Sequence, residues 1–112
     1  MNDYIMIEIA FSRRKEVNNV INTLLDNKLI ASAQVLMSDS SWNYKGKRTS
    51  RKEYLLLLKT RRIFTGDIYK VVKNVHSYET FEFAIFNLLS TSKEYLDWIN
   101  DETKSKTHVI KL

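Results

Sequence analysis

The stretch 40-SSWNYKGKRTSRKEYLLLLKT-60 decides the fold of this chain. It opens with two aromatic residues, turns at Gly46, passes through five basic residues and ends in the apolar run 54-YLLLL-58. Glycine permits a tight turn, and an uninterrupted apolar run of this length is typical of a strand that is covered on both faces. The stretch therefore predicts a long β-hairpin with a polar tip and a buried return strand.

The apolar run presents leucine to both faces of its sheet. Successive residues of a strand point to opposite faces, so Leu55 and Leu57 lie on one face and Leu56 and Leu58 on the other. A chain of 112 residues can cover one face with its own helices. The second face needs a partner, and we expect Leu55 and Leu57 to form part of an oligomer interface.

Composition bounds the class of protein. The length of 112 residues predicts a single domain over 1–112, and the lack of cysteine excludes disulfides, thiolate metal sites and a cysteine nucleophile. The N-terminal stretch predicts a strand and not a signal peptide, and no apolar run is long enough to span a bilayer. We expect a cytoplasmic protein with no membrane partner. The net charge of +5 is typical of a solvated basic face, so we expect no nucleic-acid partner either.

Hydrophobic periodicity predicts the order of the elements. A three-four spacing of apolar residues indicates two amphipathic helices, and alternation indicates the strands. The predicted elements are a strand over 4–11, a helix from an N-cap at Ser12 to about Lys28, a strand from Ala31 into the hairpin, the return strand, a helix starting between Arg62 and Asp67, a strand over 81–89, a short helix with a capping box at Thr91 and Glu94, and a last strand over 108–112.

The order βαββαβ followed by a short helix predicts an α+β fold. The arrangement with fewest topological conflicts is a ferredoxin-like sandwich, in which two helices cover one face of an antiparallel sheet. The opposite face then carries leucine or isoleucine from three strands. An apolar surface of that size is unusual for a monomer. The pattern therefore predicts a homo-oligomer.

Five short motifs resemble those of the CutA divalent-cation-tolerance family. They are LIASAQ (29–34), SSWNYKGK (40–47), EYLLLLKT (53–60), HSYETFE (76–82) and YLDW (95–98). Their shared order and spacing cover the chain from Tyr4 to about Trp98. The resemblance implies a ferredoxin-like fold assembled as a homotrimer, similar in design to the PII signalling proteins, with long hairpins that reach to neighbouring subunits. It also implies a role in tolerance of divalent metals, copper especially.

The chain departs from the family pattern at several positions. Ser32 stands where the family has the cysteine of L-A-A-C-V-N, so a sulfur ligand for copper is missing. Trp42 and Tyr44 are exchanged relative to the family hairpin, and Ser77 and Phe81 replace the two prolines of H-P-Y-E-x-P-E. We interpret the chain as a divergent member.

One candidate metal site consists of His76, Glu79 and Glu82, between a helix and a strand. Imidazole and carboxylate ligands suit Cu²⁺ or Zn²⁺, and an irregular segment could bring them together. The commoner role for such a histidine is a hydrogen bond to a carboxylate that orders the loop. Binding of an anion or small ligand is a third interpretation.

A candidate ligand cleft consists of Trp42, Tyr44, Glu53, Lys59 and Tyr78. Glu53 and Lys59 share a strand face but lie roughly 20 Å apart, so they cannot pair within one chain. They could line a cleft between subunits, as the matching family positions suggest, or simply reach water. Trp42 and Tyr44 also share a face. We expect Trp42 to anchor the hairpin on a neighbouring subunit, with stacking on a nucleobase as the alternative.

No sequence motif indicates catalysis. The chain has no Gly-rich phosphate loop, no HExxH and no G-x-S-x-G. We therefore predict a trimeric CutA-like protein of divalent-cation (copper) tolerance that acts by binding and is not an enzyme. The alternative is a PII-like sensor trimer that binds an anionic metabolite in clefts between subunits.

Overall fold

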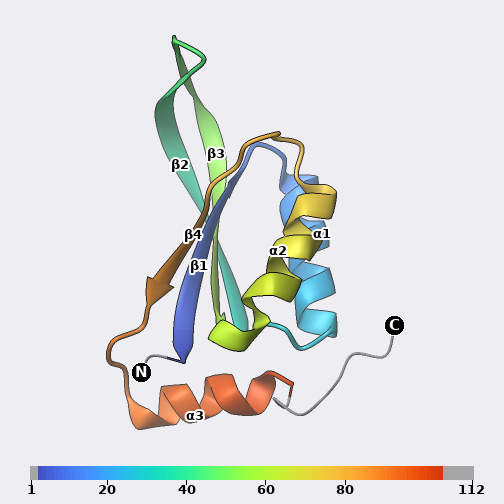
Figure 1. Ribbon diagram of the computed structural model, residues 1–112, viewed down its shortest axis with the longest axis vertical. Coiled ribbons are helices and arrows are strands. Elements are labelled where there is room, and N and C mark those ends of the chain that lie inside the picture. The colour runs from blue at the N-terminus through green and yellow to red at the C-terminus, as the bar shows by residue number, and fades with distance from the viewer. Residues whose placement is uncertain (1–2, 105–112) are drawn as a thin grey trace.

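A computed structural model describes residues 3–104 of the chain (Figure 1). No helix in this range is both long enough and apolar enough to cross a membrane. The elements in chain order are β1 (Tyr4–Phe11), α1 (Arg14–Asp26), β2 (Ser32–Tyr44), β3 (Lys47–Arg61), the 3₁₀ turn η1 (Arg62–Phe64), α2 (Thr65–Val75), β4 (Phe83–Asn87) and α3 (Lys93–Glu102).

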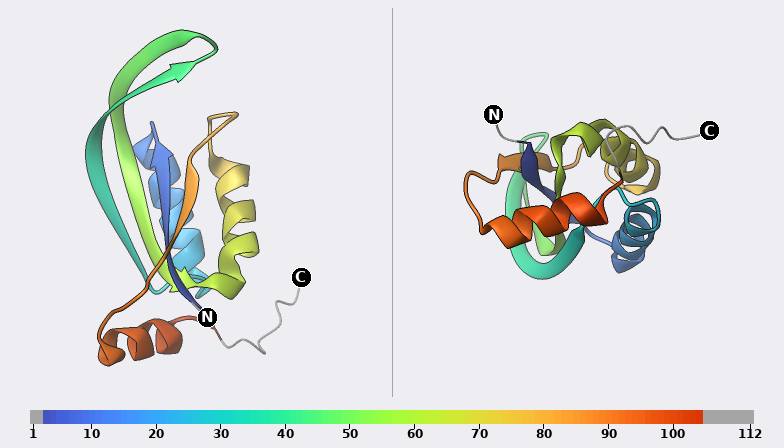
Figure 2. Two further views of the ribbon diagram at one scale, coloured as in Figure 1. Left: turned by 60° about the vertical axis from the view of Figure 1, so that its left-hand side comes forward. Right: turned by 90° about the horizontal axis from the view of Figure 1, so that it is seen from below.

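The four strands form one antiparallel sheet in the order β2-β3-β1-β4. Helices α1 and α2 lie side by side on one face of this sheet, while α3 crosses its lower end (Figures 1 and 2). This arrangement confirms the predicted α+β, ferredoxin-like fold. It leaves the second face of the sheet without a helix in the described part of the chain.

Strands β2 and β3 form the long hairpin that the sequence predicts. Its ladder runs from the pair Ser32 and Lys59 to the pair Tyr44 and Lys47. Lys45 and Gly46 form the turn with φ angles of 51° and 79°. Two positive φ values are the signature of a type I′ turn, whose twist matches that of the flanking strands. The far end of the hairpin extends beyond the other elements and curves (Figure 2).

The hydrophobic core lies between the sheet and the pair α1 and α2. Leu56 and Leu58 of β3 are completely buried in it, as the alternation predicts. Burying a large aliphatic side chain contributes about 1.5–3 kcal/mol, so this layer supplies much of the stability of the chain. Its other buried members include Ile5, Ile7, Ile9, Phe11, Val17, Val20, Leu24, Ile30, Phe64, Ile68 and Val72.

Two helix starts differ from the prediction. Helix α1 begins at Arg14, and its N-cap residue Arg13 makes no side-chain capping bond. Ser12, the predicted cap, lies one residue before the observed N-cap. Helix α3 is capped by Ser92, whose hydroxyl accepts the N–H of Tyr95 at 3.3 Å, and not by Thr91. A serine next to a threonine offers two equivalent caps, and sequence alone does not choose between them.

Strand β4 is shorter than predicted, spanning Phe83–Asn87 and not 81–89. Phe81 lies before the strand, and its ring stacks on that of His76 with centroids 4.5 Å apart. The predicted last strand, 108–112, lies outside the described residues.

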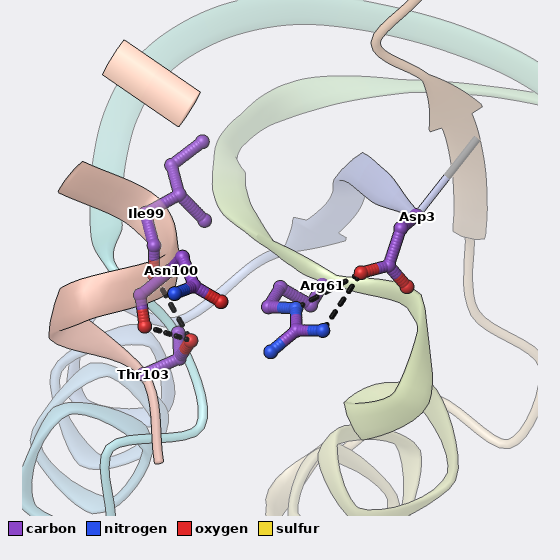
Figure 3. A network of polar contacts seen from close by, with 5 residues as sticks. All are labelled: Asp3, Arg61, Ile99, Asn100 and Thr103. Carbon is purple, nitrogen blue, oxygen red and sulfur yellow. Dashed lines mark hydrogen bonds and ion pairs between the residues drawn. The ribbon is translucent and has the colours of Figure 1, made fainter. Parts of the chain in front are cut away.

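Helix α3 closes the lower end of the sheet beside the end of β3 (Figure 3). Ile99 of α3 is completely buried, and the buried hydroxyl of Thr103 donates to its carbonyl at 3.0 Å. Nearby, Nε and Nη2 of Arg61 donate to one carboxylate oxygen of Asp3 at 3.0 and 2.8 Å. The Arg61 side chain is 13% exposed, so this ion pair is better shielded from water than an ordinary surface pair.

Candidate functional site

His76 fixes the loop that joins α2 to β4. One ring nitrogen, Nε2, lies 2.7 Å from the carbonyl oxygen of Ala10, and the other, Nδ1, accepts the backbone N–H of Tyr78 at 3.1 Å. The ring is also stacked between Phe11 and Phe81, with centroids 4.4 and 4.5 Å away. These partners require the neutral tautomer with the proton on Nε2. Burial agrees with this, because it lowers the pKa of His76 below its ordinary value of 6.5.

This geometry does not fit the predicted metal set of His76, Glu79 and Glu82. A metal ligand needs a free ring lone pair, and that of His76 is used by the backbone. In the described part of the chain, no group of three or more His, Asp or Glu side chains could hold a metal ion. His76 orders its loop through hydrogen bonds to backbone atoms, and not through the carboxylate that the sequence predicts.

A cleft of about 1010 Å³ lies between the hairpin and the loop Ser77–Glu82. It is lined by four of the five residues predicted for a ligand cleft, Trp42, Tyr44, Glu53 and Tyr78. The fifth, Lys59, does not line it, and its Nζ donates to Oε1 of Gln34 at 3.0 Å. Glu79 and Glu82, two of the three predicted metal ligands, also line this cleft. His76 does not line it, but its hydrogen bonds hold the loop that carries the two glutamates.

The cleft carries more negative than positive charge. Its lining includes four carboxylates, those of Asp39, Glu53, Glu79 and Glu82, and the guanidinium of Arg51. Arg51 lies over the Trp42 ring at 6.0 Å from its centroid. The Asp39 carboxylate forms an ion pair with the Lys52 ammonium at 2.7 Å, and both side chains are largely exposed to water. Such a surface pair does little to screen the negative charge of the other three carboxylates.

Sequence reasoning missed Asp39 and Arg51 as cleft residues. A signal for Arg51 was present, because Arg51 and Glu53 are two apart on β3 and therefore share a face. The register gives the same result, since Arg51 pairs with Ser40, two residues from Trp42. The sequence gives no corresponding signal for Asp39, because alternation places it on the opposite face of β2 from Trp42.

Glu53 is buried at the inner end of the cleft. It is 6% exposed, and the Tyr78 hydroxyl donates to its Oε2 at 2.9 Å. Burial of the Tyr78 hydroxyl and this bond to a negative group both raise the pKa of Tyr78 above its ordinary value of 10. The bond ties the loop after α2 to strand β3.

Beside the cleft, the sheet face opposite α1 and α2 is open; we call it the open face. Strand register places Leu36 of β2 beside Leu55 of β3, and Met6 of β1 beside Phe86 of β4, all on this face. Leu36 is 53% and Phe86 46% exposed. Leu55 and Leu57, predicted as interface residues, lie on it half-buried, whereas Trp42 lines the cleft.

Comparison with known proteins identifies the family. A family model described as "CutA1 divalent ion tolerance protein" matches residues 5–102. The chain is 32% identical over 97 residues to the divalent-cation tolerance protein CutA of Archaeoglobus fulgidus, covering 87% of this chain and 94% of that protein. The corresponding protein of Pyrococcus horikoshii is 27% identical over 100 residues, which cover 89% of this chain and 98% of that protein.

Solved structures give the same result. The structure titled "Periplasmic divalent cation tolerance protein CutA from Archaeoglobus fulgidus" superposes with a TM-score of 0.86 at 27% identity, covering 90% of this chain and 99% of that one. CutA1 from Shewanella sp. SIB1, at 21% identity, shares the fold with a TM-score of 0.87, covering 93% of this chain and 98% of that one. The family match, the relatives and the ferredoxin-like sheet agree, and the chain therefore belongs to the CutA1 divalent ion tolerance protein family.

Proposed function

We propose that this chain works as a homotrimeric binding protein of the divalent-cation response, with no catalytic activity of its own. The observation that carries the proposal is the open face. Leu36 and Phe86 remain accessible there, whereas Leu56 and Leu58 on the opposite face are completely buried. Contiguous apolar surface of this kind marks a protein–protein interface. Assembly of copies through the open face would cover it and would bring the adjacent cleft between subunits.

Molar mass in solution tests the assembly. Light scattering of the wild type at micromolar concentration is expected to give the mass of three chains of 13.3 kDa each. Leu57→Lys places an ammonium group in the centre of the open face and is expected to leave single chains. The matched control is Leu25→Lys, because Leu25 is 43% exposed on α1, away from the open face. A wild type of one-chain mass would refute the assembly.

Divalent cations are the proposed ligands of the cleft, with copper or zinc first because the family is named for tolerance of such ions. Glu79 and Glu82 are the proposed ligands there, and a second copy would have to complete their coordination, since residues 3–104 of one chain offer too few ligands. We assign no ligand role to His76.

Titration calorimetry with Cu²⁺ and Zn²⁺ tests this assignment. Glu79→Gln is expected to weaken cation binding, whereas His76→Phe, which keeps an aromatic ring between Phe11 and Phe81, is expected to leave it within about twofold. Loss of binding in His76→Phe alone, with the trimer mass intact, would restore His76 as a ligand.

The alternative function is a PII-like sensor of an anionic metabolite. The volume of the cleft supports a small ligand, but four carboxylates against one guanidinium oppose an anion. Lys59, the cation first expected to hold it, lies outside the cleft lining. A screen of anionic metabolites and nucleotides is therefore expected to find no binder. A binder that is lost in Arg51→Ala would favour the sensor over the cation-response protein.

A cytoplasmic location belongs to the same proposal. Fractionation of cells that produce the chain tests it, and recovery from an exported fraction would contradict it. The titles of relatives place family members in more than one compartment, periplasmic in one case and chloroplastic in another.

A further inference from the structure

Loop 77–82 forms one wall of the cleft and belongs to no helix or strand. One of its anchors is exposed to water: the backbone N–H and the hydroxyl of Ser77 donate to Oε1 of Glu16 at 3.2 and 3.3 Å. A second anchor lies at the inner end of the cleft, where the Tyr78 hydroxyl donates to Oε2 of Glu53 at 2.9 Å. Both anchors hold only the first two residues of the loop.

The third anchor is the ring of His76, which joins both ends of the loop to β1. Nε2 donates to the Ala10 carbonyl of β1 at 2.7 Å, and Nδ1 accepts the N–H of Tyr78 at 3.1 Å. The ring is also stacked between Phe11 of β1 and Phe81 near the end of the loop. A single ring thus connects the sheet with the start and the end of the cleft wall.

Protonation of His76 would break the loop side of this anchor and keep the strand side. An imidazolium carries a proton on both ring nitrogens and accepts no hydrogen bond. Its Nδ1–H would face the N–H of Tyr78, so that two donors would meet, while Nε2 would still donate to Ala10. The charge would also lie between two phenyl rings, which offer no hydrogen-bond acceptor in place of water. Both changes favour an open loop.

We propose that His76 is a proton-operated latch of the cleft: the neutral ring holds loop 77–82 closed, and protonation of the ring raises the fraction of chains in which this loop is open. The inference goes beyond the proposed function, because it requires neither a bound cation nor a second copy of the chain. It gives the cleft a wall that opens more often as the pH falls.

The surrounding charges set the direction of this latch. Glu16 of α1 and Glu53 of β3 both favour the charged ring of His76, whereas β1 contributes only an uncharged ring and a backbone carbonyl. On α2 itself, Lys73 is exposed one turn earlier, and in the loop Tyr78 stays neutral because its pKa is raised. Burial outweighs the carboxylates, so the pKa of His76 lies below its ordinary value of 6.5. The closed loop therefore disfavours the proton, and opening the loop favours its uptake.

Hydrogen exchange of the Tyr78 amide measures how often the loop opens. Its protection factor is the exchange rate of an unstructured chain divided by the observed rate, and it falls as the open fraction rises. In the wild type without added metal, the factor is expected to be constant above pH 7. Below pH 6.5 it should fall by up to about tenfold per pH unit until the pKa of His76 is reached. NMR between pH 5 and 8 covers this range, and the ring resonances give the pKa of His76 in the same samples.

Two substitutions remove the titrating ring in different ways. In His76→Asn the side chain can accept the N–H two residues on, as in an Asx turn, so the Tyr78 amide should stay protected to the same degree at every pH. His76→Phe keeps a stacked ring without an acceptor, so protection should be lower than in the wild type at pH 7.5 and independent of pH. Ser77→Ala is the matched control, because it removes one bond to Glu16 and should keep the wild-type dependence on pH.

Three results would each overturn the latch: a wild-type protection factor that does not change with pH, a fall that persists in His76→Asn or His76→Phe, or a pKa of His76 above 6.5. Because no metal is added, failure of the latch and failure of cation binding are separate results. The apparent affinity of a ligand falls only with the fraction of chains that can bind it. A variant whose loop is open in about one chain in twenty should therefore bind cations almost as well as the wild type.

Discussion

On the face that α1 and α2 cover, Leu56 and Leu58 are completely buried; on the open face, their neighbours Leu55 and Leu57 are half-buried and Leu36 is 53% exposed. The strands that carry the two layers are the same. The helices of residues 3–104 cover one layer only, so the first core is complete within a single chain and the second is not. Stability should therefore depend mainly on the covered face, and assembly on the open one.

The largest expected effect separates the two faces directly. Leu56→Ala removes a side chain from the packed core and should lower the free energy of unfolding by about 2–5 kcal/mol. Urea unfolding at several protein concentrations measures it, and the loss should not depend on concentration.

Leu57→Ala is the matched variant, one residue away on the open face. Its effect on a single chain should be smaller, because the side chain already contacts water. Its effect should grow with protein concentration as assembly begins to contribute to stability. Equal, concentration-independent losses in both variants would mean that the open face does not assemble.

Much of this architecture could be predicted from sequence. Alternation in 54-YLLLL-58 assigns each leucine to its face, and Gly46 marks the turn, because both depend on local geometry alone. The caps of α1 and α3 were each displaced by one residue, in α3 because the neighbouring Ser92 and Thr91 compete for the same cap.

The candidate site was harder to predict because it depends on tertiary contacts. The role of His76 depends on Ala10, a residue 66 positions away, and nothing local to 76-HSYETFE-82 indicates that a backbone carbonyl will occupy its ring. By contrast, Trp42, Glu53 and Tyr78 could be placed together from the family motifs, because these preserve order and spacing.

An intermediate effect is expected at His76, which supports the covered side of the loop. His76→Phe keeps the stacked ring but leaves the Ala10 carbonyl and the Tyr78 N–H without this partner, at a cost of about 1–3 kcal/mol near pH 7.5. Because burial lowers the pKa of His76, the unfolded chain takes up the proton first as pH falls. The stabilisation by His76 is thus complete above pH 6.5, the ordinary pKa of histidine, and is lost progressively as the pH falls below that value.

Urea unfolding of wild type and His76→Phe at pH 7.5 and 5.5, at one protein concentration, tests this sign. The difference between the two proteins should shrink at the lower pH. Glu82 should behave in the opposite way, because its raised pKa favours the folded state at low pH, and this contribution is lost as pH rises through about 7. A difference for His76→Phe that is the same at both values would mean that the histidine does not titrate on unfolding.

The smallest expected effect lies where the two faces meet, at the bond from Tyr78 to Glu53. Tyr78→Phe removes only the hydroxyl, and we expect a loss of about 0.5–1.5 kcal/mol in urea unfolding, because water in the cleft can replace part of the donor. Tyr69→Phe is the control, since Tyr69 of α2 is 39% exposed and its ring stacks on Phe81. An effect of several kcal/mol for Tyr78→Phe would mean that Glu53 is isolated from water, and that the cleft belongs to the packed core and not to the open side of the molecule.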